Sequence, residues 1–210
     1  MSSDLAHRAR PQLPGRELSL LARAQRGDVA AFEQLAGAHL GGLFAATLRL
    51  VGDRNEAEDV MQETLLRAWR GIGRFRGGSG FSTWLHRIAV NEANRSFTKG
   101  MRRPETTRLA DEQLELSSAT DKGPVGQTED GELRDAVRTA LLTLPIPHRT
   151  AVVLRDIEGL STREAAYVAG IGEATLKRRL HQARLKIRAE LGDRALAAEA
   201  CDERLRREPS

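Results

Sequence analysis

The segment from Leu160 to Leu191 constrains the fold more than any other part of this chain, because it predicts two helices separated by a tight glycine turn. Ser161 occupies the expected N-cap of the first helix, and Glu164 three residues later completes a capping box. Gly170 and Gly172 interrupt the helical pattern at a place where a positive φ costs little. An apolar stripe at helical spacing marks the second helix: Leu176, Leu180, Ala183 and Ile187. The order helix, glycine turn, helix is typical of a helix-turn-helix.

The second helix of this pair is strongly basic. Residues 173–190 contain six Lys or Arg and two acidic residues, a local charge of +4 that equals the net charge of the whole chain. The apolar stripe leaves several polar side chains facing outward: Thr175, Lys177, Arg178, His181 and Gln182. A basic amphipathic helix can be simply a solvated surface. Next to a capped helix and a glycine turn, it favours binding to the phosphates of duplex DNA.

The composition excludes several classes of protein. The chain has 210 residues, 40% hydrophobic and 30% charged, which suits one large globular domain or two small ones. Its only cysteine, Cys201, can form neither an internal disulfide nor a zinc cluster, so we expect a reducing, cytoplasmic location. No apolar run approaches the roughly 20 residues of a membrane span, so we expect no membrane insertion. No nucleotide-binding glycine motif, metal-ligand cluster or nucleophile–base pair is visible. We therefore expect no enzyme activity, no cofactor and no bound metal.

Helical periodicity runs through two parts of the chain and is interrupted between them. Residues 17–97 are predicted as one helical domain, and residues 132–191 as a second that contains the helix-turn-helix. Residues 98–131 are predicted as a flexible acidic linker, since Lys122 is the only basic residue among seven acids in residues 109–132. Beyond the domains lie a disordered basic arm at residues 1–16 and a tail at residues 192–210. Since no β alternation persists, the predicted fold class is all-α.

Three residues are expected to begin helices in the first domain. Asp28, Asp53 and Ser82 each precede a run of helical periodicity and carry a side-chain oxygen that can accept from a backbone N–H. The helix after Ser82 is expected to end near Arg95. A loop with five glycines, residues 71–80, precedes that helix.

Aromatic residues are concentrated in the first domain, where residues 32–97 hold seven of the eight Phe, Trp and Tyr side chains. Phe75, Phe81 and Trp84 flank the glycine loop beside several cations. Aromatic faces among cations suit stacking on unpaired bases, at roughly 1–3 kcal/mol for each base. Closing the loop against the core is an equally consistent role for Phe81 and Trp84, and the spacing leaves the two interpretations open.

These segments together resemble the extracytoplasmic-function (ECF) sigma factors of bacterial RNA polymerase. The first domain carries the motifs AEDVMQETLLRAWRGIGRFRG and GFSTWLHRIAVNEANR. The second carries LPIPHRTAVVLRDIEGLSTREAAYVAGIGEATLKRRLHQARLKIR. The resemblance implies a protein of sigma regions two and four that binds core RNA polymerase, directs it to promoters and assists promoter opening.

The resemblance assigns two surfaces to the first domain. One helix face is similar to the surface that binds the clamp helices of the largest catalytic polymerase subunit: Asp59, Gln62, Glu63, Leu66 and Arg67. The glycine loop and the next helix resemble the reader of the opened minus-ten strand, which captures a flipped base. The residues expected there are Arg74, Phe75, Arg76, Phe81, Trp84, Arg87 and Asn91. Trp84, Arg87 and Asn91 share one helix face at i, i+3 and i+7, so they can act together.

The second domain is expected to read the minus-thirty-five element as duplex DNA. Lys177 or Arg178 would contact guanine, while Arg179 and Arg184 serve phosphates. The full expected contact set is Glu173, Thr175, Lys177, Arg178, Arg179, His181, Gln182 and Arg184. The family also implies contact with the polymerase β flap and an anti-sigma partner. The acidic linker is expected to occupy a basic channel of the polymerase, or to be only a solvated spacer.

Two points limit what the resemblance transfers. Arg178 stands where the family most often has a small residue, so the promoter sequence cannot be transferred. The tail after Leu191 is a further helix, a regulatory contact or a disordered segment. The alternative function is a helix-turn-helix repressor or activator whose first domain senses a ligand.

Overall fold

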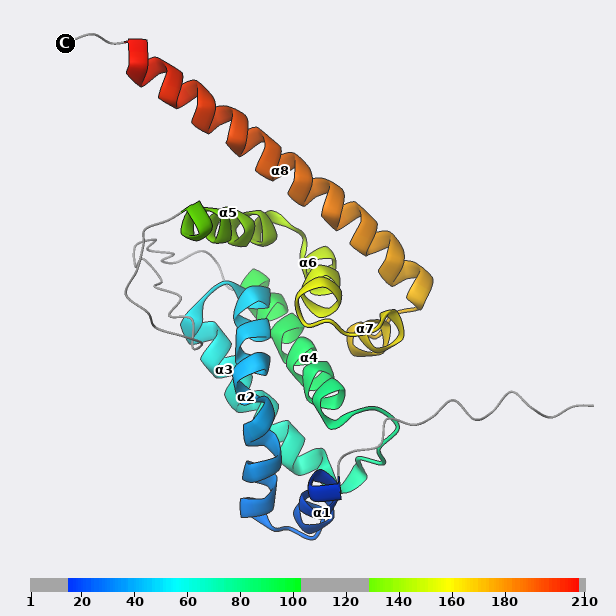
Figure 1. Ribbon diagram of the computed structural model, residues 1–210. Coiled ribbons are helices and arrows are strands. Elements are labelled where there is room, and N and C mark those ends of the chain that lie inside the picture. Colours follow the sequence, from blue (N-terminus) through cyan, green and yellow to red (C-terminus); the bar gives the residue numbers. More distant parts are fainter. Residues whose placement is uncertain (1–14, 103–128, 208–210) are drawn as a thin grey trace, which may run out of the picture.

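The computed structural model of the chain describes residues 15–102 and 129–207, and every regular element within them is helical (Figure 1). The predicted all-α fold is therefore confirmed. Residues 1–14 of the predicted basic arm and residues 103–128 of the predicted acidic linker lie outside the described residues, whereas the remaining residues of both segments are helical. The elements are α1 (Gly15–Ala24), α2 (Val29–Val51), α3 (Arg54–Gly71), η1 (Ile72–Arg74), α4 (Phe81–Arg102), α5 (Glu129–Thr143), α6 (Ile146–Val152), η2 (Val153–Ile157), α7 (Thr162–Ala169) and α8 (Glu173–Arg207).

Side-chain caps begin α2 and α3 where the sequence predicts them. The Asp28 carboxylate accepts from the backbone N–H of Ala31 at 3.0 Å, and Asp53 accepts from that of Glu56 at 2.8 Å. Each bond satisfies one backbone donor that has no partner within the helix. Gly52 then ends α2 with a φ of 87°, a conformation that a side chain would strain.

The beginning of α4 differs from the expectation. The helix begins at Phe81 and continues to Arg102, so Ser82 lies inside the first turn and the prediction that it caps the helix is wrong. Trp84 donates its backbone N–H to the carbonyl of Gly80 at 3.0 Å, so the first helical bond begins two residues earlier than a cap at Ser82 would place it. Burial of Phe81, which is 1% exposed, outweighs the preference of a serine for the cap position.

The core of the first domain lies between α1, α2, α3 and α4. Phe32, Leu35 and Leu43 of α2 pack there with Leu85 of α4. Phe75 and Phe81 join this core from the end of the glycine loop, with ring centroids 5.8 Å apart. The loop is thus closed from inside by aromatic packing.

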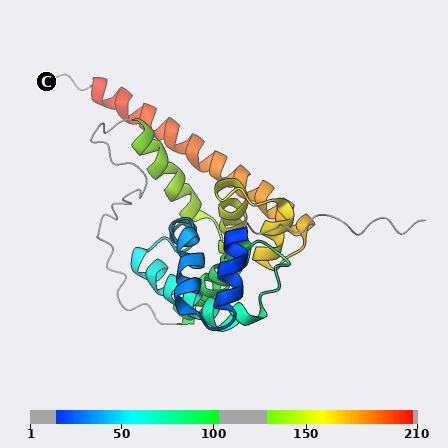
Figure 2. The ribbon, with the colours of Figure 1, turned by 60° about the horizontal axis from the view of Figure 1, so that its bottom comes forward.

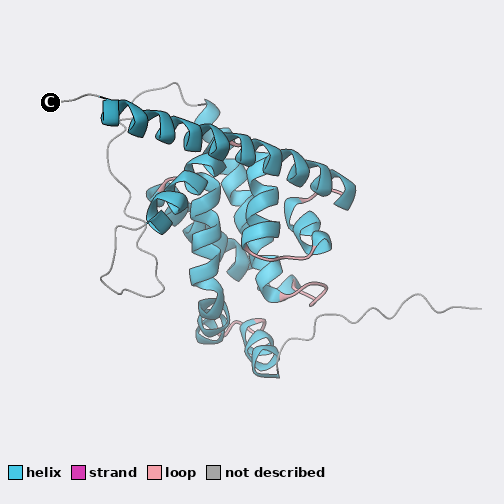
Figure 3. Cartoon of the chain, turned by 45° about the horizontal axis from the view of Figure 1, so that its top comes forward, coloured by secondary structure: helices cyan, strands magenta, loops and turns pink. Residues whose placement is uncertain are grey.

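The helix-turn-helix of the second domain has the predicted local structure. The Ser161 hydroxyl accepts from the backbone N–H of Glu164, and the Glu164 carboxylate accepts from that of Ser161, so the capping box is complete. Gly170 ends α7 with a φ of 66°. Helix α8 then runs without interruption past Leu191 to Arg207, so the segment predicted as a tail begins as a continuation of this helix (Figure 3).

Arg149 joins the ends of several elements. It is 8% exposed, and its guanidinium donates to the carbonyls of Leu141, Leu142 and Leu144 at the end of α5. Its Nη1 also donates to the carbonyl of Leu50 in α2 at 2.6 Å. Burial lowers the pKa of Arg149, but an arginine remains charged at any physiological pH. A single cation therefore binds carbonyls at helix ends in both domains.

The two domains pack against each other over α4 and the end of α2. Leu50 and Val90 belong to the same hydrophobic cluster as the core of the second domain. The carboxylate of Glu158 lies 3.7 Å from Nη1 of Arg49 and 3.5 Å from Nε2 of His86. Figures 1 and 2 both show α7 beside α4, while α8 extends beyond the rest of the molecule. The second domain therefore covers one face of the helix that the family resemblance assigns to the opened strand.

Candidate nucleic-acid interface

The second helix of the helix-turn-helix, α8, has one buried and one exposed face. Leu176, Leu180 and Ala183 of the predicted stripe are 1%, 9% and 0% exposed. Lys177 and Arg178 point to solvent and have no ion-pair partner within the described part of the chain. Of the other predicted contacts, Glu173 and His181 are exposed, and Thr175 and Arg179 are half-buried. The packing of the stripe thus holds a row of unpaired cations outward.

Two predicted DNA contacts of α8 are engaged within their own domain. Arg184 binds the Asp156 carboxylate through two N–H groups, at 3.0 and 2.6 Å. This hydrogen bonding raises the pKa of Arg184. The Gln182 side-chain oxygen lies 3.0 Å from Nε2 of His148 in α6. Both side chains therefore fix α8 against the preceding elements, a role that the sequence pattern does not reveal.

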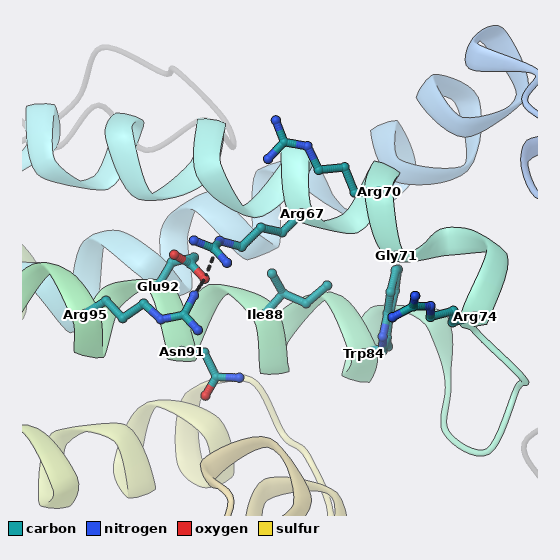
Figure 4. A pocket seen from close by; sticks show the side chains of 9 residues that line it. All are labelled: Arg67, Arg70, Gly71, Arg74, Trp84, Ile88, Asn91, Glu92 and Arg95. Atoms are coloured by element: carbon teal, nitrogen blue, oxygen red, sulfur yellow. Dashed lines mark hydrogen bonds and ion pairs between the residues drawn. The ribbon is translucent and has the colours of Figure 1, made fainter.

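A groove of about 510 Å³ lies between α3 and α4 in the first domain (Figure 4). Its lining is rich in arginine and comes from both helices and the short η1 turn. The lining residues are Arg67, Arg70, Gly71, Arg74, Trp84, Ile88, Asn91, Glu92 and Arg95. With four arginines against one carboxylate, the groove suits an anionic ligand.

One end of the groove holds a buried carboxylate between two arginines. Glu92 is 6% exposed, and its Oε1 accepts a hydrogen bond from Nη1 of Arg95 at 2.6 Å and forms an ion pair with Arg67, whose Nε lies 2.8 Å away. At the other end the Trp84 indole lies against Gly71, where an added Cβ would stand 3.4 Å from the ring. Figure 4 shows Arg74 beside this indole.

The glycine loop forms a second, smaller pocket of about 250 Å³ next to the groove. It is lined by Arg74, Phe75, Arg76, Gly78, Ser79, Trp84 and Tyr167. Phe81 is only 1% exposed and supports this surface from the core, so it offers no free face to a base in this arrangement. Phe75 is 7% exposed and lines the pocket, and its expected contact with a base stays a prediction. Trp84 remains partly accessible, packed on both phenyl rings with centroids 5.0 and 5.6 Å away.

Arg87 and Asn91 continue the face of α4 on which Trp84 lies. The Arg87 guanidinium stands over the Tyr167 ring of α7, 4.2 Å from its centroid, in a cation–π contact. Asn91 is exposed and lines the groove. The structure therefore brings Trp84, Arg87 and Asn91 onto one surface, as the helical spacing predicts, but partly covers Arg87 with the second domain.

The predicted polymerase-binding residues share one exposed face of α3. All five are solvent-exposed: Asp59, Gln62, Glu63, Leu66 and Arg67. Leu66 is unusual among them, since a leucine that is 48% exposed amid charged neighbours suits a protein contact. Arg67 belongs to this face and also to the groove.

The sequence pattern missed Glu92, Arg95 and Tyr167 as parts of the site. Glu92 and Arg95 stand three residues apart on one helix, which is a signal of a possible ion pair. Tyr167 reaches the pocket only through the packing of one domain on the other, for which the sequence offers no local signal. Within the described residues, no helix is long and apolar enough to cross a membrane, and no group of side chains forms a metal site.

Two family models match the chain, in the order of the two domains. Sigma-70 region 2 matches residues 35–103, and sigma-70 region 4 matches residues 134–187. The chain is therefore a two-domain protein of the sigma-70 class. Because the first domain matches region 2, the alternative of a ligand-sensing domain with a repressor or activator function is not supported.

Similar proteins narrow the class further. The chain is 36% identical over 170 residues to the RNA polymerase sigma-H factor of Pseudomonas aeruginosa, covering 79% of this chain and 88% of the relative. It is 35% identical over 171 residues to the ECF RNA polymerase sigma-E factor of Haemophilus influenzae, covering 79% and 90%. The chain belongs to the ECF family of RNA polymerase sigma factors, which bind RNA polymerase and direct promoter-specific initiation of transcription.

Solved structures agree with this assignment. One is CnrH in complex with the cytosolic domain of CnrY, with a TM-score of 0.62, 25% identity and coverage of 85% of this chain and 99% of that chain. Another is the sigma factor RpoE in complex with the anti-sigma factor NepR from Bartonella quintana, with a TM-score of 0.60, 26% identity and coverage of 78% and 98%. The fold of both domains is thus shared with ECF sigma factors.

Proposed function

We propose that this sigma factor divides its promoter contacts between two surfaces, with α8 reading upstream duplex DNA and the α3–α4 groove receiving the opened strand. The observation that carries the proposal is that each surface has cations and a shape suited to a different form of DNA. Helix α8 is a rigid exposed rod of the kind that enters a major groove. The α3–α4 groove combines arginines with one accessible indole, as single-strand sites do.

At the upstream element, Arg178 and Lys177 donate to base edges, and Arg179 donates to phosphate. Their support is geometric, since the buried stripe of α8 holds this face outward. Glu173, Thr175 and His181 complete the contact set. Arg184 and Gln182 hold the helix in place through Asp156 and His148.

At the opened strand, Trp84 stacks on an unpaired base, Asn91 bonds to a base edge, and Arg74, Arg76 and Arg87 neutralise phosphates. The small pocket of the glycine loop accepts the flipped base. Capture of a flipped base costs a few kcal/mol of unstacking, which stacking on Trp84 offsets. Since Tyr167 stands over Arg87, binding of the strand requires α7 to move away from α4.

The exposed face of α3 binds the clamp helices of the polymerase, with Leu66 as its apolar centre, and the second domain contacts the β flap. An anti-sigma factor regulates the chain, a proposal supported by the neighbouring structures of sigma factors with such partners. We also infer that the protein acts in the cytoplasm, where promoter DNA and polymerase are found, and has no catalytic activity of its own.

Run-off transcription with purified core polymerase on genomic fragments tests the proposal. We expect promoter-specific products that depend on this chain. A second reaction with a known sigma factor establishes that the core enzyme is competent. The absence of any product under these conditions would overturn the proposed function.

A further inference from the structure

The least explained residue of the groove is Glu92. A buried carboxylate is costly unless it is paired, and an acid at the floor of an anion-binding groove opposes the binding of the ligand by simple electrostatics. Glu92 is nevertheless 6% exposed and shares a single oxygen between Arg67 of α3 and Arg95 of α4. Its role must therefore lie in what it does to the two arginines.

The geometry leaves both arginines able to bind a second anion. Arg67 approaches Glu92 through Nε and Arg95 through Nη1, while a guanidinium carries five N–H donors. Their side chains are 44% and 55% exposed, so their remaining donors are open to solvent. In Figure 4 the two guanidinium groups converge on Glu92 from the two helices that form the groove.

We propose that Glu92 is a positioning residue. It holds Arg67 and Arg95 so that together they form a binding site for a backbone phosphate of single-stranded DNA. An arginine normally loses considerable side-chain freedom when it orders on a ligand. Here the carboxylate has already ordered both side chains before DNA binds. The inference rests on the proposed function and adds Arg95 and Glu92 to the strand-binding surface.

The ligand is a single strand because of what lies at the other end of the groove. Arg74 stands beside the Trp84 indole there, so a strand along the groove meets a phosphate site, an aromatic face and a second cation in succession. Duplex DNA offers no unstacked base to an indole. A free phosphate would use the arginine pair but not Trp84.

The test compares two variants with the same chemical change beside the same arginine. Glu92→Gln and Glu63→Gln each remove one negative charge near Arg67, but Glu63 is exposed and lies 3.7 Å from its Nε. Binding of the full chain to a short fluorescein-labelled oligothymidine is measured by fluorescence anisotropy at several salt concentrations, with circular dichroism as a check on folding.

We expect Glu92→Gln to weaken binding by about 3- to 10-fold, which corresponds to roughly 0.7–1.4 kcal/mol. The slope of log K against log salt should fall by about 0.7 for each phosphate of the single strand that the variant no longer neutralises. Glu63→Gln should bind as tightly as the wild type or slightly more tightly. If Glu92→Gln also binds as tightly or more tightly, charge alone governs the groove and the positioning role is overturned.

A second pair of variants tests the proposed phosphate site if Glu92→Gln fails to fold. Arg95→Gln should lower the salt slope by about 0.7, while Arg54→Gln, an exposed arginine paired with Glu58 on α3, should leave it unchanged. Equal slopes for the two variants would overturn the proposal. The assay contains no polymerase, so run-off transcription by the wild type combined with no effect here rejects only the role of Glu92 and Arg95.

Discussion

The two helices that we propose to contact DNA, α8 and α4, differ in how exposed their cations are. On α8, Lys177 and Arg178 are exposed and have no ion-pair partner within the described part of the chain. On α4, Arg87 is half-buried under Tyr167 of the other domain. The surface proposed to read duplex DNA is therefore exposed, whereas the surface proposed to bind the opened strand is partly covered. The difference favours an order in which duplex contact precedes strand capture.

Loss of Arg149 should have the largest effect, because this residue joins the ends of α2 and α5 and thus the two regions being compared. Arg149→Met removes the side-chain donor that the carbonyls of Leu50 and Leu144 share. We expect the free energy of unfolding in urea to fall by about 3 kcal/mol. Arg163→Met, at an exposed site, should stay within about 0.5 kcal/mol of the wild type. Equal stability of the two variants would show that Arg149 does not stabilise the junction of α2 and α5.

Arg178→Ala tests whether the duplex-reading surface is as complete as it looks. A good contact to a base is worth about 1–3 kcal/mol of discrimination, so holoenzyme binding to the upstream element should weaken by about 10- to 100-fold. Arg184→Ala is the matched control, because its guanidinium is engaged by Asp156. Electrophoretic mobility shifts measure both. A larger loss for Arg184→Ala would mean that the ion pair opens on DNA and that the surface is not preformed.

The capping box should make the stability of the duplex-reading domain depend on pH. The hydrogen bond from Ser161 holds the pKa of Glu164 below its usual value of 4.5. A lowered pKa stabilises the fold above the unfolded value, and this contribution disappears as pH falls through the folded value. Relative to Glu164→Gln, the wild type should gain about 1 kcal/mol in the free energy of unfolding at neutral pH and nothing in strong acid. Glu33→Gln, at an exposed position of α2, should show no such convergence.

Tyr167→Ala should have the smallest effect of these variants. It removes the ring that covers Arg87 on α4 and so exposes the surface proposed to bind the opened strand. Losing an exposed cation–π contact costs about 0.5–1 kcal/mol, so oligothymidine affinity of the free chain should rise by about 2- to 5-fold. Tyr167→Phe keeps the ring over Arg87 and should bind as the wild type does. Weaker binding by Tyr167→Ala would show that the ring itself contacts the strand, because Tyr167 also lines the loop pocket.

Local signals in the sequence predicted the helix-turn-helix well. A cap and its partner stand three residues apart, so Asp28, Asp53 and Ser161 reveal their roles within one turn of chain. The buried stripe of α8 follows from helical periodicity in the same way. The prediction that Ser82 caps α4 was wrong, because packing of Phe81 into the core decided where this helix begins.

Contacts between distant segments account for what the sequence did not predict. Arg67 and Glu92 lie on different helices, and neither helix's periodicity reports their pairing. Arg149 and Leu50 are 99 residues apart. The core position of Phe81 likewise depends on how the glycine loop closes, which spacing alone left open.

The division of labour between duplex and opened strand is tested most directly by run-off transcription from one promoter in two forms, fully paired and pre-melted around the minus-ten element. We expect Trp84→Ala to reduce product severely on the paired template and to recover on the pre-melted one, because its stacking contribution offsets the cost of unstacking. Arg178→Ala should be impaired on both templates. If pre-melting fails to rescue Trp84→Ala, or rescues both variants equally, the two surfaces do not divide the work as proposed.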